Sequence, residues 1–127
     1  MKLLLLSDLD FLEMLSQKQD LMKILCILVG SFEIIDLTFS MLSIKGKQGF
    51  VAENVIALNG AELMSATRMK QNDDIHIADC ANINYCAQNK RILVTNDDAV
   101  CRVAKRYGVE TMDSNDLLNS LTRRKMG

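Results

Sequence analysis

Residues 91–108, RILVTNDDAVCRVAKRYG, decide the fold of this chain because their pattern changes sharply in the middle. The apolar run at residues 92–94 is rich in β-branched side chains, which predicts a short strand buried on both faces. After the polar turn, apolar residues recur with helical spacing, so residues 98–107 are predicted to form an amphipathic helix. Asp97 is expected to cap this helix, and Gly108 to end it. The stretch is therefore a strand, a tight turn and a helix.

The same alternation of strand and helix continues on both sides of this stretch. Apolar runs predict further strands at residues 2–7, 32–36 and 109–112. Helices are predicted near residues 11–15, capped by Asp10, and at residues 21–28, 37–44, 50–58, 75–89, capped by residues 72–74, and after Asp113 and Ser114. Residues 45–49 have the composition of a loop, and residues 61–72 fit either a helix or an irregular segment.

This alternation predicts the fold class and the domain. Strands and helices that alternate with short connections indicate an α/β fold, here a single three-layer domain whose parallel sheet carries helices on both faces. We expect the domain to span residues 1–122, followed by a basic tail at residues 123–127.

Composition sets limits on what the chain can bind. With 127 residues, 49% hydrophobic and 24% charged, it is long enough and apolar enough to form a core of its own. Fifteen basic and 16 acidic residues give a formal net charge of -1, so no overall basic field attracts nucleic acid. A phosphate-bearing partner would have to be held locally or through metal ions.

The cysteines and the leucine-rich start bear on location. The four cysteines form no CxxC pair, and a single histidine, His76, rules out the usual Cys/His zinc spacing, so reduced thiols are expected. The leucine run near the start meets a charge at Asp8, too early for a signal peptide, and residues 21–29 contain Lys23 and are too short to cross a bilayer. We therefore expect a cytoplasmic protein without a membrane contact.

Three aspartates stand where an α/β protein carries its chemistry. Asp8 follows the first predicted strand, Asp97 follows the strand at residues 92–94, and Asp79 lies near the start of a later helix. If these two strands are neighbours, the three acids meet at the carboxyl edge of the sheet, where open α/β sheets bind ligands. Each also has a structural interpretation, since Asp97 suits a helix cap and the helix dipole favours Asp79.

A cluster of acids favours divalent cations. Carboxylates held close together raise each other's pKa, and Mg²⁺ or Mn²⁺ relieves the repulsion because both prefer oxygen ligands. Two such ions can polarise a phosphodiester, generate hydroxide and stabilise the leaving oxygen. Asp8, Asp79 and Asp97 are the candidate catalytic and metal-binding residues, with Asp98 as a further metal ligand.

Residues 72–112 resemble the C-terminal half of a PIN domain, in which a helix carrying an acid precedes a strand ending in Thr-x-Asp. Asp79 matches the helical acid, and Thr95 and Asp97 match Thr-x-Asp. The segment LLLLSDLDFL resembles the family's first strand, with Asp8 as its terminal acid. The resemblance implies a PIN-like sheet and an Mg²⁺- or Mn²⁺-dependent endoribonuclease. Many PIN proteins of this size are toxins of toxin-antitoxin pairs and are dimeric, so an antitoxin partner and a homodimer are implied too.

One departure from the PIN pattern bears on activity. The family's second acid is a glutamate on the helix after the second strand, and Met41 stands near the expected position. Asp36 and Glu53 are nearby acids, but neither sits at the matching place. A nuclease with reduced activity, or a catalytically weak or inactive PIN-like binding module, is therefore an alternative.

A second alternative rests on the sequence Asp8-Leu9-Asp10. It also resembles the first motif of haloacid-dehalogenase-like phosphatases, with Asp8 as nucleophile and Asp10 as general acid. Against it, Leu12 stands where that family has Thr or Val, and Asp79 would have no role.

Two further features lie near the candidate acids. His76, one turn before Asp79, has three interpretations: a general base, a hydrogen-bond donor to a phosphate, or simply an exposed residue at the start of the helix. Arg102, Lys105 and Arg106 share one face of the helix after Asp97, where they either steer an RNA backbone or form a solvated side.

Overall fold

A computed structural model describes residues 3–126 of the chain. Its centre is a five-stranded sheet in the order β3-β2-β1-β4-β5, in which every neighbouring pair of strands is parallel. The strands are short and have the bounds β1 Leu4–Leu6, β2 Phe32–Ile35, β3 Val55–Ile56, β4 Ile92–Val94 and β5 Thr111–Met112. The parallel sheet predicted from the alternation of strands and helices is confirmed.

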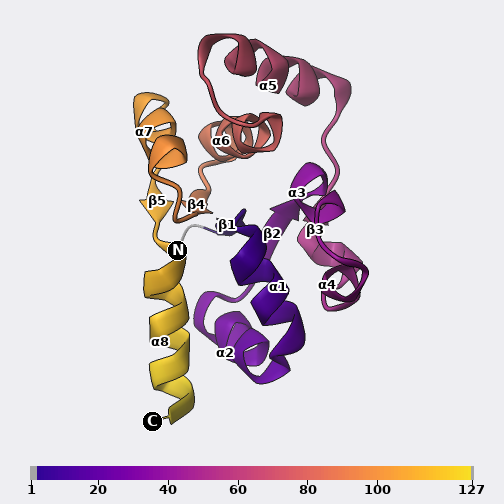
Figure 1. Cartoon of the computed structure of the whole chain (residues 1–127), viewed down its shortest axis with the longest axis vertical. Coiled ribbons are helices and arrows are strands. Elements are labelled where there is room, and N and C mark those ends of the chain that lie inside the picture. Colours follow the sequence, from indigo (N-terminus) through magenta and orange to yellow (C-terminus); the bar gives the residue numbers. More distant parts are fainter. Residues whose placement is uncertain (1–2, 127) are drawn as a thin grey trace.

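Helices cover both faces of this sheet, which makes three layers (Figure 1). One side carries α1, α2 and α8, and the other carries α5, α6 and α7. The helices are α1 Leu9–Gln17, α2 Gln19–Val29, α3 Asp36–Ser40, α4 Ile44–Gln48, α5 Gly60–Asn72, α6 Ile77–Asn89, α7 Asp98–Arg106 and α8 Ser114–Met126, with a short 3-10 turn, η1, at Ala52–Asn54.

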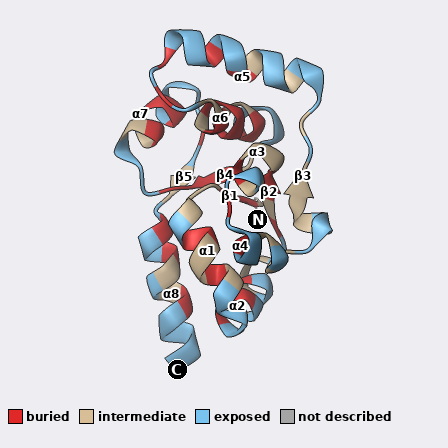
Figure 2. Cartoon of the chain, turned by 45° about the vertical axis from the view of Figure 1, so that its right-hand side comes forward, coloured by how far each residue is buried: buried red, intermediate tan, exposed pale blue. Residues whose placement is uncertain are grey.

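Each central strand contributes side chains to both layers of the core because successive side chains point to opposite faces of a sheet. Leu4 and Leu6 of β1 pack with α1, α2 and α8, whereas Leu5 packs with α5, α6 and α7. All three leucines are buried, and so is the whole of β4 (Figure 2). Double-sided burial explains why both strands are continuous apolar runs.

The middle of the chain differs from the prediction. Residues 45–49 were expected to be a loop, but most of them belong to α4, and residues 50–58 were expected to be a helix, but they form η1 and β3. α4 packs on α1, and Gly49 at the end of α4 is required by this packing, since a Cβ there would lie 2.5 Å from Cβ of Ser16. β3 pairs with β2, a long-range partnership that no local periodicity reveals.

Several helix starts also differ from the prediction. Residues 61–72 are helical as part of α5, whose capping box joins Asn59 and Glu62. α6 begins at Ile77 with His76 as its cap, so the expected cap at residues 72–74 is wrong. Asp73 instead accepts hydrogen bonds from α7 and its C-cap, with Arg106 and Tyr107 as donors.

At the two ends of the described chain, helix boundaries are shifted as well. Asp8 rather than Asp10 caps α1, because its Oδ1 accepts the backbone N–H groups of Asp10 and Phe11. α8 runs through residues 123–126, which the sequence assigned to a tail, and Lys125 on it forms an ion pair with Asp20 at the start of α2.

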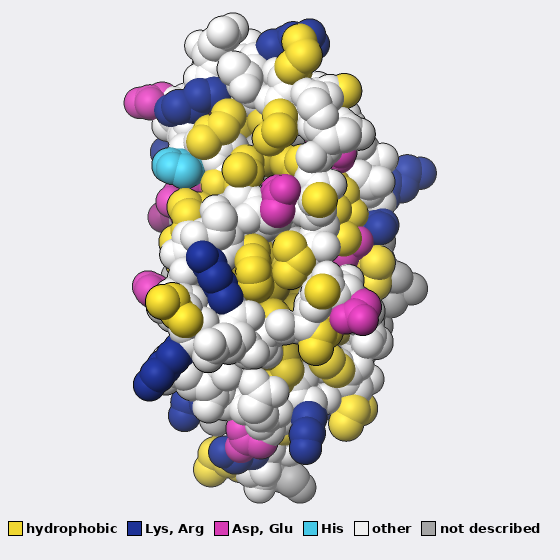
Figure 3. All heavy atoms as spheres, turned by 90° about the vertical axis from the view of Figure 1, so that its right-hand side faces the viewer, with side chains coloured by type: hydrophobic (Ala, Val, Ile, Leu, Met, Phe, Trp, Pro, Cys, Tyr) yellow, Lys and Arg dark blue, Asp and Glu magenta, His cyan; other side chains and the backbone are white. Residues whose placement is uncertain are grey.

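One face of the molecule exposes apolar side chains. Figure 3 shows them gathered on the side that carries α3, α4, β3 and α5. The large exposed apolar residues of this region are Met41, Ile44, Val51, Leu63 and Met64, and we refer to them as the apolar face. Exposed apolar side chains gathered on one face are typical of contact surfaces between proteins.

Candidate functional site

The sheet order places the first and fourth strands side by side, as the candidate site requires. β1 pairs with β4 so that Leu6 lies opposite Val94. Beyond that pair, the hydroxyl of Ser7 donates to the carbonyl oxygen of Val94 at 2.9 Å. The segments carrying Asp8 and Asp97 therefore leave the sheet at the same carboxyl edge.

Asp8 is held from two sides. Its Oδ1 accepts the N–H groups of Asp10 at 3.0 Å and of Phe11 at 3.3 Å. Its Oδ2 accepts the hydroxyl of Ser114, at the start of α8, at 2.6 Å. These donors fix the orientation of the carboxylate. Ser114 was not predicted as a site residue, because the local sequence indicated only a helix cap there.

Thr95 connects Asp8 with Asp97. Its buried hydroxyl accepts the N–H of Asp97 at 3.2 Å, and its carbonyl oxygen accepts the N–H of Ser114 at 3.3 Å. Asp97 in turn caps α7, as predicted, by accepting the N–H of Ala99 at 2.9 Å. A continuous chain of hydrogen bonds thus links the two acids through Ser114 and Thr95.

Asp79 joins this edge from α6. It is half-buried in the first turn of that helix. Burial raises the pKa of its carboxyl, the Asp97 carboxylate raises the pKa further, and His76 lowers it. His76 caps α6 with its Nδ1, which accepts the N–H of Ala78 at 3.1 Å. Asp79 and Asp97 are therefore electrostatically coupled.

The remaining predicted ligand stands apart. Asp98 is exposed at the start of α7, and within residues 3–126 no hydrogen bond or ion pair joins it to another acid of the site. Within the same residues, no lysine or arginine pairs with Asp79 or Asp97. The only basic group that acts on this pair among the described residues is therefore His76, through its effect on Asp79.

A buried hydroxyl links α3 with the helix that carries Asp79. Met41 follows α3 and is 43% exposed, whereas Thr38 on α3 is buried and accepts a hydrogen bond from the amide of Asn82 at 3.2 Å. Asn82 lies one turn after Asp79 on α6. The α3 side chain that reaches the helix of Asp79 is therefore a threonine, which the local pattern around Met41 did not indicate.

Asp36 directly follows the neighbouring strand β2 and has a partly satisfied carboxyl. Its Oδ2 accepts the N–H of Leu58 at 3.3 Å, whereas its Oδ1 is buried without a hydrogen-bond partner in the described chain. The hydrogen bond from Leu58 places the Asp36 carboxyl beside the segment that follows β3. Among the described residues, Asp36 and the other acids form no joint group of three.

The donor set fits a cation that keeps most of its water. Across residues 3–126, no three His, Cys, Asp or Glu side chains converge closely enough to hold a metal ion. Mg²⁺ is typically bound by one or two carboxylates together with waters and substrate phosphates. Asp79 and Asp97 offer such a pair of oxygen ligands, and Asp8 is connected to the segment of Asp97 through Ser114 and Thr95.

Two hollows flank these acids. One, of about 180 Å³, lies between α1 and α8 and is lined by Asp8, Asp10, Phe11, Met14, Asn96, Asn115 and Leu118. The other, of about 530 Å³, is a basic concavity on α7 lined by Arg102, Lys105 and Arg106. The first shares Asp8 with the candidate site, and the second lies on the helix that Asp97 caps.

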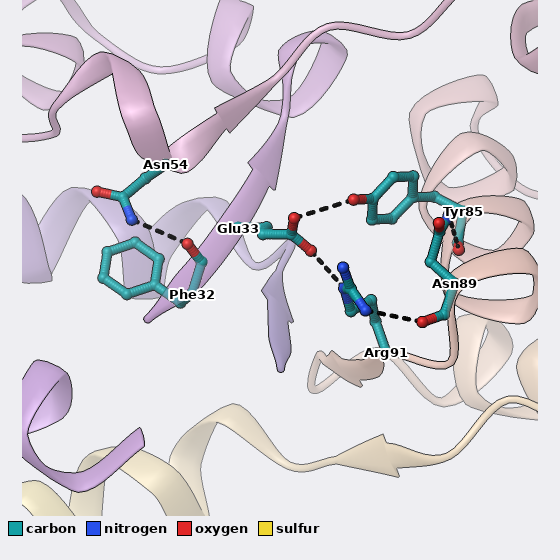
Figure 4. Close-up of polar contacts among 6 residues, drawn as sticks. All are labelled: Phe32, Glu33, Asn54, Tyr85, Asn89 and Arg91. Carbon is teal, nitrogen blue, oxygen red and sulfur yellow. Dashed lines mark hydrogen bonds and ion pairs between the residues drawn. The ribbon is translucent and has the colours of Figure 1, made fainter. Parts of the chain in front are cut away.

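A second polar cluster, at the amino edge of the sheet, is fully paired. Glu33 of β2 accepts the hydroxyl of Tyr85 at 3.0 Å and forms a 2.6 Å ion pair with Arg91 (Figure 4). Burial and the Glu33 contact raise the pKa of Tyr85 to about 12. Because each charge has a partner, this cluster joins β2, α6 and β4 structurally and offers no group for chemistry.

Comparisons with known proteins agree with the fold. The chain is similar to the solved structure described as "Crystal structure of PAE2754 from Pyrobaculum aerophilum", with a TM-score of 0.67 and 18% sequence identity over 97% of this chain and 99% of that chain. No family model and no curated protein matches the chain. In residues 3–126, every helix is too short or too polar to cross a membrane. The likeness at this identity establishes a shared α/β fold.

Proposed function

We propose that this chain is a PIN-like, Mg²⁺- or Mn²⁺-dependent endoribonuclease. The observation that carries the proposal is the coupled pair Asp79 and Asp97, two acids without a lysine or arginine partner among the described residues, at the carboxyl edge of a parallel sheet. Holding these charges near each other opposes folding, so a retained pair is best explained by a cation that uses it. The order of Asp8, Asp79, Thr95 and Asp97 along the chain, which resembles the PIN pattern, supports the same reaction class.

The chain's own residues would have distinct roles. Asp79 and Asp97 would supply the oxygen ligands, while Ser114 and Thr95 keep Asp8 oriented beside them. A bound Mg²⁺ or Mn²⁺ would polarise the phosphate and make the attacking water more acidic. RNA fits as substrate although the net charge of the chain is -1. The bound metal ions and local basic groups, here those of α7, would hold its phosphates.

Metal binding is the first test. Calorimetric titration with Mn²⁺ should give a binding signal for the wild type and none, or a far weaker one, for Asp79→Asn and Asp97→Asn. Asp116→Asn is the matched control, because Asp116 is an exposed acid on α8 outside the pair. Equal binding by all four proteins would show that the coupled acids are not the metal site.

Cleavage is the second test. With Mn²⁺ present, the wild type should cut single-stranded RNA, chelation should stop the reaction, and Asp79→Asn should be as damaging as Asp97→Asn. Retained cleavage by these two variants at saturating Mn²⁺ would refute the proposal. The haloacid-dehalogenase alternative instead expects Asp8→Asn and Asp10→Asn to abolish activity while Asp79→Asn has little effect.

A weak or inactive PIN-like binding module is the second candidate function. Thr38 favours it, because a hydroxyl bonded to Asn82 stands where α3 meets the helix of Asp79. The phosphatase has less support, since Asp8 as nucleophile would have to leave its contacts with Ser114 and with the start of α1. Absence of both Mn²⁺ binding and RNA cleavage in the wild type would favour the binding module.

A homodimer and an antitoxin partner belong to the same proposal. The apolar face offers the homodimer a contact surface, and Ile44, which is 77% exposed, is its most exposed residue. Ile44→Asp should therefore shift a dimer to monomer in sedimentation experiments. Ile27→Asp is the control, because Ile27 is 84% exposed on α2, outside the apolar face.

A further inference from the structure

The hollow between α1 and α8 adjoins the candidate active site. Asp8 belongs to both, and Asn96, which also lines the hollow, immediately precedes Asp97. Its volume of about 180 Å³ is below the range of drug-sized ligand pockets, so it suits one small planar ring system. A strand whose phosphate lay at Asp79 and Asp97 would have a base within reach of this hollow.

The polar groups of the hollow are available to a ligand. The side-chain amides of Asn96 and Asn115 form no hydrogen bond with any residue in 3–126, and the same holds for the carboxylate of Asp10. Their backbones are nevertheless held in place. Asn96 follows Thr95 and Asn115 follows Ser114, and the bond from the N–H of Ser114 to the carbonyl of Thr95 brings the two segments together.

The rest of the lining is apolar. Phe11 is buried beneath the hollow, and Met14 and Leu118 are half-buried beside it. All three belong to or pack on the core between α1 and α8, which gives this side of the hollow a fixed position. An apolar wall together with polar side chains matches an aromatic base, which has an apolar face and a polar edge.

We propose that this hollow binds a guanine base of the RNA strand, next to the phosphate that the acids address; this rests on the proposed nuclease function. Guanine presents N1–H and N2–H donors side by side, and a carboxylate such as that of Asp10 accepts both. The amides of Asn96 and Asn115 can donate to its O6 and N7 acceptors. Adenine, cytosine and uracil each lack the paired donors, so they leave the Asp10 carboxylate less well satisfied.

The experiment separates the hollow from the cleavage reaction. Binding of the four 5′-mononucleotides is measured by NMR titration without metal, so neither catalysis nor a metal site enters the result. Guanosine monophosphate should bind at least about fivefold more tightly than the other three, the smallest ratio expected from one good bidentate pair. The largest chemical-shift changes on addition of guanosine monophosphate should occur at the side-chain amides of Asn96 and Asn115.

Variants then assign the preference to its residues. Asp10→Asn and the double substitution Asn96→Ala with Asn115→Ala should remove the guanine preference, and neither breaks a side-chain hydrogen bond within residues 3–126. Asn119→Ala, on an exposed part of α8 outside the hollow, should leave it unchanged.

The outcomes distinguish the two proposals. Equal binding of all four nucleotides, no binding at all, or a preference that survives Asp10→Asn would overturn the guanine site even if the wild type cleaves RNA. A guanine preference carried by Asp10 in a protein that neither binds Mn²⁺ nor cuts RNA would instead overturn the nuclease and leave a guanine-binding site.

Discussion

The hydroxyl of Ser114 donates to Oδ2 of Asp8 at 2.6 Å, joining two residues that are 106 positions apart in the chain. Ser114 is buried, so the contact is shielded from solvent. Hydrogen bonds to charged acceptors are stronger than neutral ones because the acceptor carries a full charge. This bond therefore ties the start of α8 to the end of β1 and orients an acid of the candidate site.

Removing the Ser114 hydroxyl should destabilise the fold. Ser114→Ala is expected to lower the free energy of unfolding by about 1.5–3 kcal/mol, the usual contribution of a hydrogen bond to a charged group. Urea denaturation measures the change. Ser120→Ala is the control, because Ser120 is on the same helix and has no hydrogen-bonded side chain in the described part of the chain. Equal stability of the two variants would mean that Asp8 does not depend on Ser114.

Asp79 should make stability depend on pH. Because its pKa is raised from the ordinary 3.8, the folded chain binds its proton more tightly than the unfolded chain does. The free energy of unfolding therefore falls as pH rises from about 4 through the raised folded-state pKa. Asp79→Asn removes this fall, so we expect the variant to be more stable than the wild type at neutral pH and to lose the advantage in acid.

Urea denaturation across this pH range tests the sign. The exposed substitution Asp116→Asn should reproduce the wild-type curve. A wild type that gains stability relative to Asp79→Asn as pH rises would contradict the burial of a charged Asp79 beside Asp97. Addition of Mn²⁺ at neutral pH should stabilise the wild type, because a ligand of the folded state shifts the equilibrium toward it.

The packing of α4 on α1 should tolerate no side chain at Gly49. A Cβ there would lie 2.5 Å from Cβ and 2.7 Å from Cα of Ser16, so backbone would have to move. Gly49→Ala is expected to cost about 1–3 kcal/mol of unfolding free energy. Gly46→Ala should cost less, because the side chain of Glu13, its close neighbour, is flexible. Gly60→Ala, with nothing within 4 Å of its Cβ, should be neutral or stabilising. Thermal unfolding of the three variants measures these changes.

The basic concavity on α7 should contribute to RNA binding if the proposed function holds. Arg102 and Lys105 are exposed or half-exposed there, whereas Arg106 is held by a 2.6 Å ion pair with Asp73. Replacing Arg102 and Lys105 by alanine should weaken RNA binding and reduce the slope of log K against log salt by about 1.4, or about 0.7 for each phosphate that the variant no longer neutralises. Fluorescence anisotropy at several salt concentrations measures both effects. Lys23→Ala, an exposed change on α2, should alter neither.

Much of the fold follows from local patterns. β4, α7 and the cap at Asp97 were predicted within a residue or two, because apolar periodicity and helix capping act over a few neighbouring positions. The pairing of β1 with β4, which the sequence could state only as a condition for the acids to meet, is confirmed by the sheet order. The prediction failed between residues 45 and 58, where two glycines suggested a loop and β3 had too few residues to show a strand period.

The sequence by itself determined a parallel α/β domain and the three aspartates at or near the ends of its elements, since these depend on hydrophobic periodicity and on residue chemistry. Only the tertiary structure decided that Ser114 holds Asp8, that Asp79 is coupled to Asp97, and that α3 meets α6 through Thr38 and not Met41. These relationships depend on which elements pack together and at what register. A one-residue shift of an element would change every such contact while leaving the local pattern intact.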